Sequence, residues 1–325
     1  MPPGASWRDL VAPYMKPSPG RAWLQLATTF PPFVAVMAAL LAALYYHVLA
    51  GLILLPAGAV LLVRLFVIQH DCGHGSFFAS NWANGLLGRA LSLLTLTPYT
   101  FWRRDHAMHH ATTGDLDRRG TGDVTILTLE EYRALPFLRR MSYRIYRHPL
   151  VMFGVGPAWL ILLRLRIPKG SPKRQWRDWV SIVGTDLALA GLVTILIATF
   201  GLQPVLMGWL PVILLAATVG VWLFYIQHQF EHAYWAARPA WDFHAAALRG
   251  SSFYDLPAVL HWMTGNIGFH HIHHLASRIP NYRLKECHEA IPALRTAPRL
   301  TLRESFRCAR LALWDTEQGR LVPFR

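Results

Sequence analysis

Charged side chains are scarce in this 325-residue sequence. They make up 15% of it, whereas 53% of the residues are hydrophobic. Soluble domains usually carry roughly 25% charged residues, so this composition argues against an ordinary soluble protein and favours one embedded in a membrane. The few charges are also unequal, because 32 Lys and Arg residues stand against 18 Asp and Glu residues and give a net charge of +14.

Cysteine is equally rare, and motifs for common cofactors are missing. The three cysteines, Cys72, Cys287 and Cys308, form no CxxC pair, which excludes a disulfide framework and a thiolate zinc site. The sequence also lacks GxGxxG, a flavin motif, a cytochrome b5-like stretch and HExxH. No nucleic-acid motif accompanies the positive charge, so we expect anionic lipid or an acidic protein as its partner, and no nucleic acid.

Long apolar runs, in contrast, are present and have the length of membrane spans. A spanning helix needs about 20 mostly apolar residues, and four runs qualify, at about 30–50, 52–69, 179–201 and 205–227. Only the short uncharged links HVLAG and GLQPV join the members of each pair. We therefore predict an all-α integral membrane protein whose four transmembrane helices form two hairpins, within a single membrane-embedded domain covering residues 1–325.

The basic residues give the predicted orientation. Most Lys and Arg residues precede the first hairpin, separate the two hairpins or follow the second, and the positive-inside rule makes that side cytoplasmic. Both termini are then cytoplasmic. Two weaker apolar runs, 85–102 and 149–165, are expected to form interfacial or re-entrant helices; a six-span arrangement is the alternative.

Two charged residues, Arg64 and Asp186, fall inside the predicted spans. Intramembrane charges usually pair or face a polar cavity, so we predict an ion pair between the second and third spans. In the alternative, Arg64 snorkels to the interface and Asp186 binds a hydroxyl or backbone group.

Histidine is abundant and clustered. Eleven of the sixteen histidines fall in four short stretches, HDCGH, HAMHH, HQFEH and HHIHH. Within each stretch, spacings of three and four residues place the imidazoles on one helix face. Imidazole is the commonest metal-binding side chain, and nine or ten converging imidazoles are too many for one tetrahedral zinc ion. We therefore predict a site for two metal ions in a helical cap on the cytoplasmic side.

These stretches resemble the three histidine boxes of the membrane fatty acid desaturase family, whose wider group includes lipid and alkane hydroxylases. The flanking sequences WRDLVAPYMKPSPGRAWLQLATTF, RRGTGDVTILTLEEY and GFHHIHHLASRIPNYRL are similar to bacterial acyl-lipid desaturases of the mid-chain or omega-6 type. The resemblance covers roughly residues 7–290 and implies a bacterial inner-membrane protein. It also implies two iron ions, held by His70, His74, His106, His109, His110, His270, His273 and His274, and by His228, His232 or both.

The resemblance further implies a reaction. It predicts O2-dependent insertion of a cis double bond into a fatty acyl chain, carried as an acyl-lipid, acyl-CoA or acyl carrier protein. Unactivated carbons cannot be dehydrogenated by side-chain acids and bases, so the metal supplies this chemistry. Electrons are expected from a separate donor such as a ferredoxin or flavodoxin, drawn to the basic face.

Two other functions remain open. A lipid or alkane hydroxylase would use the same ligands on the same scaffold. A metal transporter would place its ligands near the membrane midplane, whereas these histidines lie at span ends and beyond.

Five further residues are expected around the metal ligands. Asp71, Asp105 and Glu231 each adjoin a ligand and could accept an imidazole N–H, most readily from a neighbouring box; an ordinary helix-end or surface acid is the alternative. Asn266 lies one turn before the last box and could hold a metal-bound water. His271 points about 100° away from its neighbour in the last box, so we expect it behind the ligands or at the surface.

Overall fold

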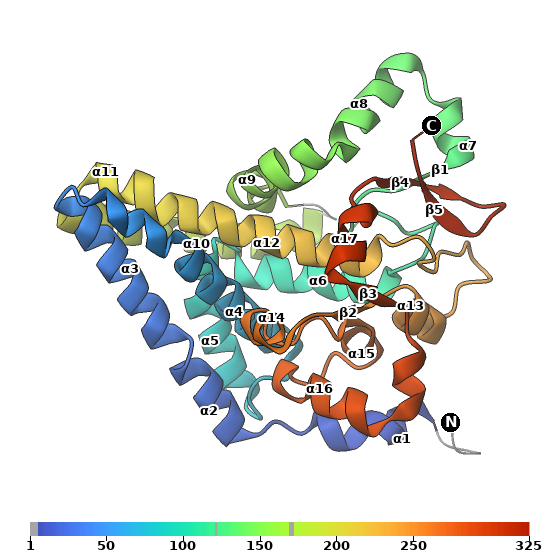
Figure 1. The fold of residues 1–325 in the computed structure, drawn as a ribbon, viewed down its shortest axis with the longest axis horizontal. Helices are drawn as coiled ribbons and strands as arrows, with labels where there is room; N and C mark the ends of the chain where they lie inside the picture. The colour runs from blue at the N-terminus through green and yellow to red at the C-terminus, as the bar shows by residue number, and fades with distance from the viewer. Residues whose placement is uncertain (1–5, 121, 169–171, 325) are drawn as a thin grey trace.

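The computed structural model describes residues 6–120, 122–168 and 172–324. Residues 169–171, part of the basic stretch IPKGSPKRQWR, lie outside this description, as do Thr121 and the chain ends at 1–5 and 325. Helices dominate the described residues (Figure 1). This agrees with the predicted helical class.

Four helical segments in the described part of the chain are long and apolar enough to cross a membrane: Pro19–Tyr45, Leu49–His74, Gln175–Phe200 and Leu202–His228. They consist mainly of α2 (Pro19–Ala27) with α3 (Phe30–Tyr45), α4 (Leu55–His74), α10 (Pro172–Phe200), and α11 (Leu202–Pro204) with α12 (Leu210–His228). The prediction of four spans is confirmed. Prolines occupy the first turn of α3, α4 and α12, where the missing N–H would have had no helical partner.

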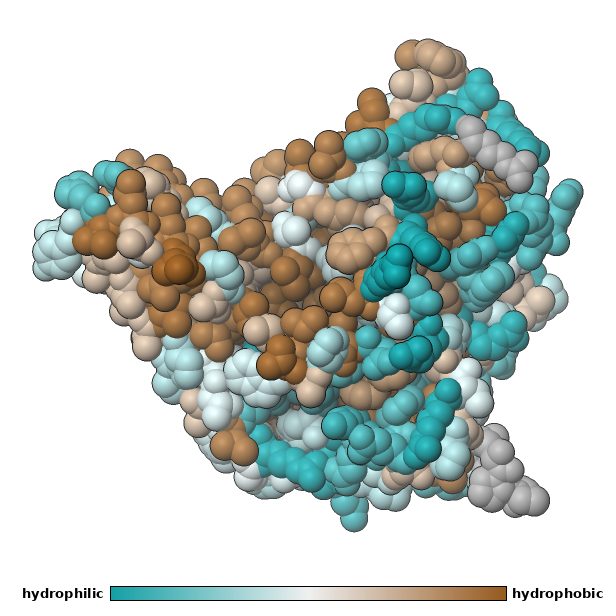
Figure 2. All heavy atoms as spheres, viewed as in Figure 1, coloured by the Kyte–Doolittle hydropathy of each residue, from teal (hydrophilic) through white to brown (hydrophobic). Residues whose placement is uncertain are grey.

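The spans form two hairpins that meet at their far ends, away from the histidines. The second hairpin turns at Gly201, whose φ of +84° is costly for residues with a Cβ. α11 packs against α3 in this region. Hydrophobic side chains predominate along the spans behind a partly hydrophilic tip, whereas hydrophilic ones gather over the opposite end, around the C-terminal strands (Figures 1 and 2).

Helix α4 lies at the centre of the bundle, and α10 lies at its edge. α4 packs against α3, α5 (Asn81–Thr95) and α12. α10 contacts α5 and α6 (Tyr99–Thr112), and only 11% of its apolar window is buried. Such an exposed apolar helix suits contact with lipid chains.

The two weaker apolar runs do not add ordinary spans. α5 is not among the helices long and apolar enough to cross, and α8 (Phe137–Arg147) bends by 59° into Val151–Arg166, which contains α9 (Gly156–Leu162). Such a bent pair is a broken span or a re-entrant loop. The described residues thus contain four spans, or five if the bent pair is counted, and do not support the six-span alternative.

The predicted ion pair between Arg64 and Asp186 is wrong. Asp186 pairs with Arg166 at 3.0 Å, whereas the Arg64 guanidinium lies 3.9 Å from the centre of the Trp262 ring and donates to Thr29. The physical reason is helix order, because α10 packs against α5 and α6 while α4 turns Arg64 toward α3 and α14 (Ala258–Met263).

Short helices and five short strands enclose the histidine end of the spans. The strands were not predicted. β1 (Leu127–Thr128) pairs in parallel with β4 (Leu311–Asp315), which pairs antiparallel with β5 (Arg320–Pro323), and β2 (Phe253–Asp255) pairs in parallel with β3 (Arg299–Thr301). The remaining α-helices are α1 (Trp7–Val11), α7 (Leu129–Ala134), α13 (Phe243–Arg249), α15 (His270–Leu275), α16 (Asn281–Ala290) and α17 (Leu302–Cys308).

Candidate metal centre

Four helices bring the clustered histidines together where α4 and α12 end. α4 contributes His70 and His74 from its last turns and stops at Gly75, whose φ is +67°. α6 contributes three histidines, α12 contributes His228 as its last residue, and α15 carries the last box. Together these four helices bring nine of the ten predicted ligands close to one another.

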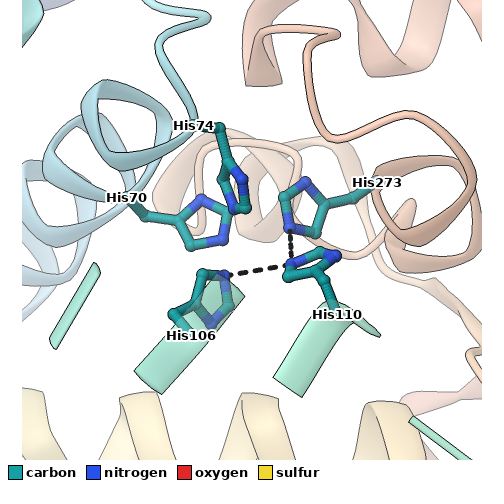
Figure 3. A group of neighbouring side chains, drawn as sticks. All are labelled: His70, His74, His106, His110 and His273. Carbon is teal, nitrogen blue, oxygen red and sulfur yellow. Dashed lines mark hydrogen bonds between the residues drawn. The ribbon is translucent and has the colours of Figure 1, made fainter. Parts of the chain in front are cut away.

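The nine histidines divide into two groups. The first is a five-histidine group, in which one potential ligand atom from each residue lies within 4.8 Å of all the others (Figure 3): His70, His74, His106, His110 and His273. Its Nε2 atoms approach closely, at 3.1 Å between His106 and His110 and 3.0 Å between His110 and His273.

The second is a four-histidine group that meets the same 4.8 Å criterion: His109, His228, His270 and His274. The Nε2 atom of His228 lies 2.9 Å from that of His270 and 3.2 Å from that of His109. The rings of His110 and His274 stack at 4.2 Å between centroids, so the two groups are neighbours. The second histidine box is thus shared, with two residues in one group and one in the other.

The donor set fits metal ions. Neither group contains a carboxylate among the described residues. Burial, and then neighbouring histidines, hold the pKa of each of these side chains well below its usual value: His106, His110, His270, His273 and His274. They are therefore neutral at physiological pH, which is the form that binds metals.

Several buried nitrogens have no hydrogen-bond partner among the described residues: His74 Nε2, His270 Nδ1, His273 Nδ1 and His274 Nε2. Buried polar atoms are rarely left unpaired in proteins. Of these, His74 Nε2 and His274 Nε2 belong to the two groups without a partner of their own, and the Nε2 atoms of His270 and His273 face other histidine nitrogens; bound cations would satisfy both kinds of atom. The five- and four-histidine groups suit two adjacent metal ions.

A hydrogen-bonded chain supports the five-histidine group from behind. The Asp71 carboxylate lies 3.3 Å from His70 Nδ1 and accepts bonds from the backbone and side-chain nitrogens of Asn281, at 2.6 Å and 2.8 Å. The Asn281 side chain in turn accepts a 2.9 Å bond from Gln25. Asp71 was predicted near a ligand, although from a neighbouring box; it contacts its own neighbour, because α16 holds the carboxylate from the other side.

Asp123 supports the four-histidine group in the same way, and the sequence reasoning missed it. Its carboxylate contacts His109 Nδ1 in a short hydrogen bond, which leaves Nε2 facing His228. The turn before it needs Gly122, because φ there is +73° and a Cβ would lie 3.0 Å from Asp105 O and from His109 Cβ. The available signal was an acid in a glycine turn, GTGD, soon after a histidine box.

Three predicted residues near the fourth span and the second box do not contact the histidine groups. His232 is exposed and belongs to neither group, and Glu231 pairs with Arg320 at 2.6 Å. The reason is that α12 ends at His228, so the four-residue spacing beyond it no longer places side chains on one face. Asp105 pairs with Arg104 at 3.2 Å, and burial raises the pKa of this carboxyl.

Asn266 and His271 also lie outside both groups. Asn266 occupies a left-handed turn with φ of +58°, and α15 begins only at His270, so it is not one helical turn before the box. His271 is fully buried, with its ring 5.4 Å from that of His288. Its burial excludes the surface position, so a place behind the two histidine groups stays the prediction.

Arg147 is a further residue that sequence reasoning missed. Its buried guanidinium donates to four oxygens from three segments: Tyr225 Oη, Gln229 Oε1, Leu311 O and Thr125 O, at 2.8–3.1 Å. Gln229 follows His228, and Thr125 lies two residues after Asp123. Arg147 therefore links the segments that carry His228 and Asp123 to strand β4.

The fold and the site define a class: a helical membrane protein with two adjacent histidine groups suited to metal ions. Comparison with known proteins then gives the family, because residues 43–306 match the model of the fatty acid desaturase family. The chain belongs to this family and is an oxidoreductase that acts on fatty acids, as predicted.

Individual relatives agree with this assignment. A fatty acid desaturase of Bacillus subtilis is 40% identical over 315 residues, which cover 97% of this chain and 89% of the relative. A Picosynechococcus sn-1 oleoyl-lipid 12-desaturase is 27% identical and covers 84% of this chain and 77% of its own length. A Nostoc sn-1 acyl-lipid omega-3 desaturase (ferredoxin) is 30% identical, with 70% of this chain and 63% of the relative aligned.

Proposed function

We propose that this protein inserts a cis double bond into a fatty acyl chain, using O2, two histidine-bound iron ions and electrons from a separate donor. The single observation that carries the proposal is the pair of adjacent groups of five and four histidines, all of them buried or partly buried. Imidazole is a good ligand for iron, and the family membership points to desaturation. When bound, the irons would supply the oxidising power that C–H cleavage needs.

The chain's own residues would hold and shield the metals. The five- and four-histidine groups would bind one iron each, so His228 is the proposed extra ligand and His232 is not. Asp71 and Asp123 would fix the orientation of His70 and His109 by accepting their Nδ1–H groups, which leaves Nε2 free to bind. The four-histidine group is fully buried, which would keep bulk water from competing for its ligand positions.

The proposal extends to the setting of the enzyme. The whole chain would form one membrane-embedded domain in a bacterial inner membrane, with the histidine end and both termini cytoplasmic, as the distribution of basic residues favours. A soluble acidic carrier such as a ferredoxin or flavodoxin would then reach the histidine end. The name of the Nostoc relative supports a ferredoxin.

Expression in a host without this activity tests the proposal. Fatty acids are profiled with double-bond location, after iron loading and with a reductase and ferredoxin present. A new double bond at one position is expected, and it should be absent from a His273→Ala control. A hydroxylated fatty acid in place of the double bond would favour the lipid hydroxylase alternative, and an unchanged profile would contradict both.

A further inference from the structure

Arg64 is a buried cation without a counter-ion. Its residue is only 3% exposed, although it lies in the apolar helix α4. Among the described residues it forms no ion pair, and its one side-chain hydrogen bond runs 3.3 Å from Nε to Thr29 Oγ1. That hydroxyl is neutral and donates its own proton to Gln25 O at 2.6 Å. A buried charge normally has an ionic or strongly hydrogen-bonded partner, so the two Nη groups of Arg64 call for a further ligand.

Residues that are themselves exposed cover the buried Arg64. Its guanidinium lies 3.9 Å from the centre of the Trp262 ring, and this tryptophan is 48% exposed. Val259, on the same short helix α14, is 62% exposed. Tryptophan concentrates at the boundary between hydrocarbon and headgroups, and the hydrophobic surface of the spans continues toward α14 (Figure 2). The exposed Trp262 thus suits the headgroup boundary of a bilayer, with Arg64 buried behind it.

We propose that Arg64, held in place by Trp262 and Thr29, binds the phosphate of a glycerophospholipid in the leaflet on the histidine side. The planar guanidinium offers paired donors that match phosphate oxygens. Trp262 covers one face of the guanidinium by a cation–π contact, which leaves the edge with the Nη groups for the anion. The acyl chains of the same molecule would cover the exposed apolar surface of Trp262 and Val259. One amphiphilic ligand thus satisfies both the charge and the hydrophobic surface.

This phosphate site is connected to the metal centre. Arg64 precedes His70 by six residues on α4, about 9 Å along the helix axis. A hydrogen-bonded route also joins the two residues, through Thr29, Gln25, Asn281 and Asp71. Resting on the proposed function, this position suits a phospholipid-linked acyl substrate, the class that the names of the acyl-lipid relatives also give.

Binding of phosphatidylglycerol to the purified full-length protein tests the site. Native mass spectrometry in detergent would measure its occupancy, with a diacylglycerol of the same chains as the phosphate-free probe. Loss of a charge-assisted bond predicts that Arg64→Gln binds phosphatidylglycerol about tenfold more weakly and leaves diacylglycerol unchanged. Arg64→Lys should lose less, because it keeps the charge without the fork. The matched control is Arg89→Gln, an exposed arginine of α5.

The outcomes are distinct. Equal phosphatidylglycerol binding by Arg64→Gln and wild type, or an equal loss of both probes, would overturn the site. If Arg64→Gln does not fold, Arg64→Lys and Trp262→Leu carry the same comparison, and unchanged phosphatidylglycerol binding by both would overturn it equally.

Desaturation of phospholipid-linked chains in nanodiscs separates this inference from the proposed function. A wild type that binds phosphatidylglycerol through Arg64 but forms no double bond would contradict the function and keep the site. An Arg64→Gln variant that desaturates phospholipid at the wild-type rate would contradict the substrate assignment and keep the function.

Discussion

Asp123 gives the sharpest test of the division of the histidines into two groups. Its carboxylate contacts His109 Nδ1, and that histidine belongs to the four-histidine group alone. Asp123→Asn removes the negative charge but keeps the size of the side chain. Loss of such a supporting partner typically weakens metal binding 10- to 100-fold, or about 1.4–2.7 kcal/mol. The five-histidine group keeps all its own contacts, so it should retain its metal.

Metal content after chelator titration measures this effect. The wild type should hold about two iron ions per chain at chelator concentrations at which Asp123→Asn holds about one. Asp117→Asn is the matched control, because Asp117 lies in the same loop, is exposed, and bonds to the backbone of Arg238 rather than to a histidine. Simultaneous loss of both irons, or loss equal to that in the control, would refute the independence of the two groups.

Three further outcomes are expected. Burial lowers the pKa of His271 to about 3, so its stabilising contribution is complete above the unfolded value near 6.5 and is lost as the pH falls toward 3. The stability of the metal-free protein should therefore decline between pH 7 and pH 5.5, and His271→Gln should remove about 1 kcal/mol of that decline, as measured by thermal unfolding. An unchanged decline in the variant would contradict this. His228→Ala should lose roughly one iron per chain by metal analysis while His232→Ala keeps both, and the reverse result would restore His232 as a ligand. Arg147→Gln should lower the free energy of unfolding by about 3 kcal/mol, because buried oxygens lose their donor, whereas the exposed Arg139→Gln should change it little; equal denaturation midpoints for the two variants would be inconsistent with this role.

Local patterns made most of the candidate site predictable. Residues spaced by three or four positions share a helix face whatever the tertiary structure, so the first and last boxes could be assigned from spacing. The pattern failed where a helix ended. His232 and Asn266 were placed by extending helices that stop at His228 and begin at His270, and helix ends are less well encoded than helix interiors.

Contacts between distant segments were beyond local patterns. Asp123 meets His109 through a glycine turn, and Asn281 reaches Asp71 from a helix 210 residues later. The Arg64–Asp186 prediction failed for the same reason, since two charges inside spans reveal their depth but not the rotation of their helices. Helix rotation depends on the side-chain packing of the whole bundle.

The sequence by itself determined that this protein is a helical membrane protein rich in metal-binding histidines, because apolar run length and imidazole spacing are properties of single helices. Only the tertiary structure decided how nine histidines divide into five and four. His109 and His110 are adjacent in sequence but point about 100° apart on α6, so they face different groups. Which histidines each one meets depends on how α4, α12 and α15 pack around that helix.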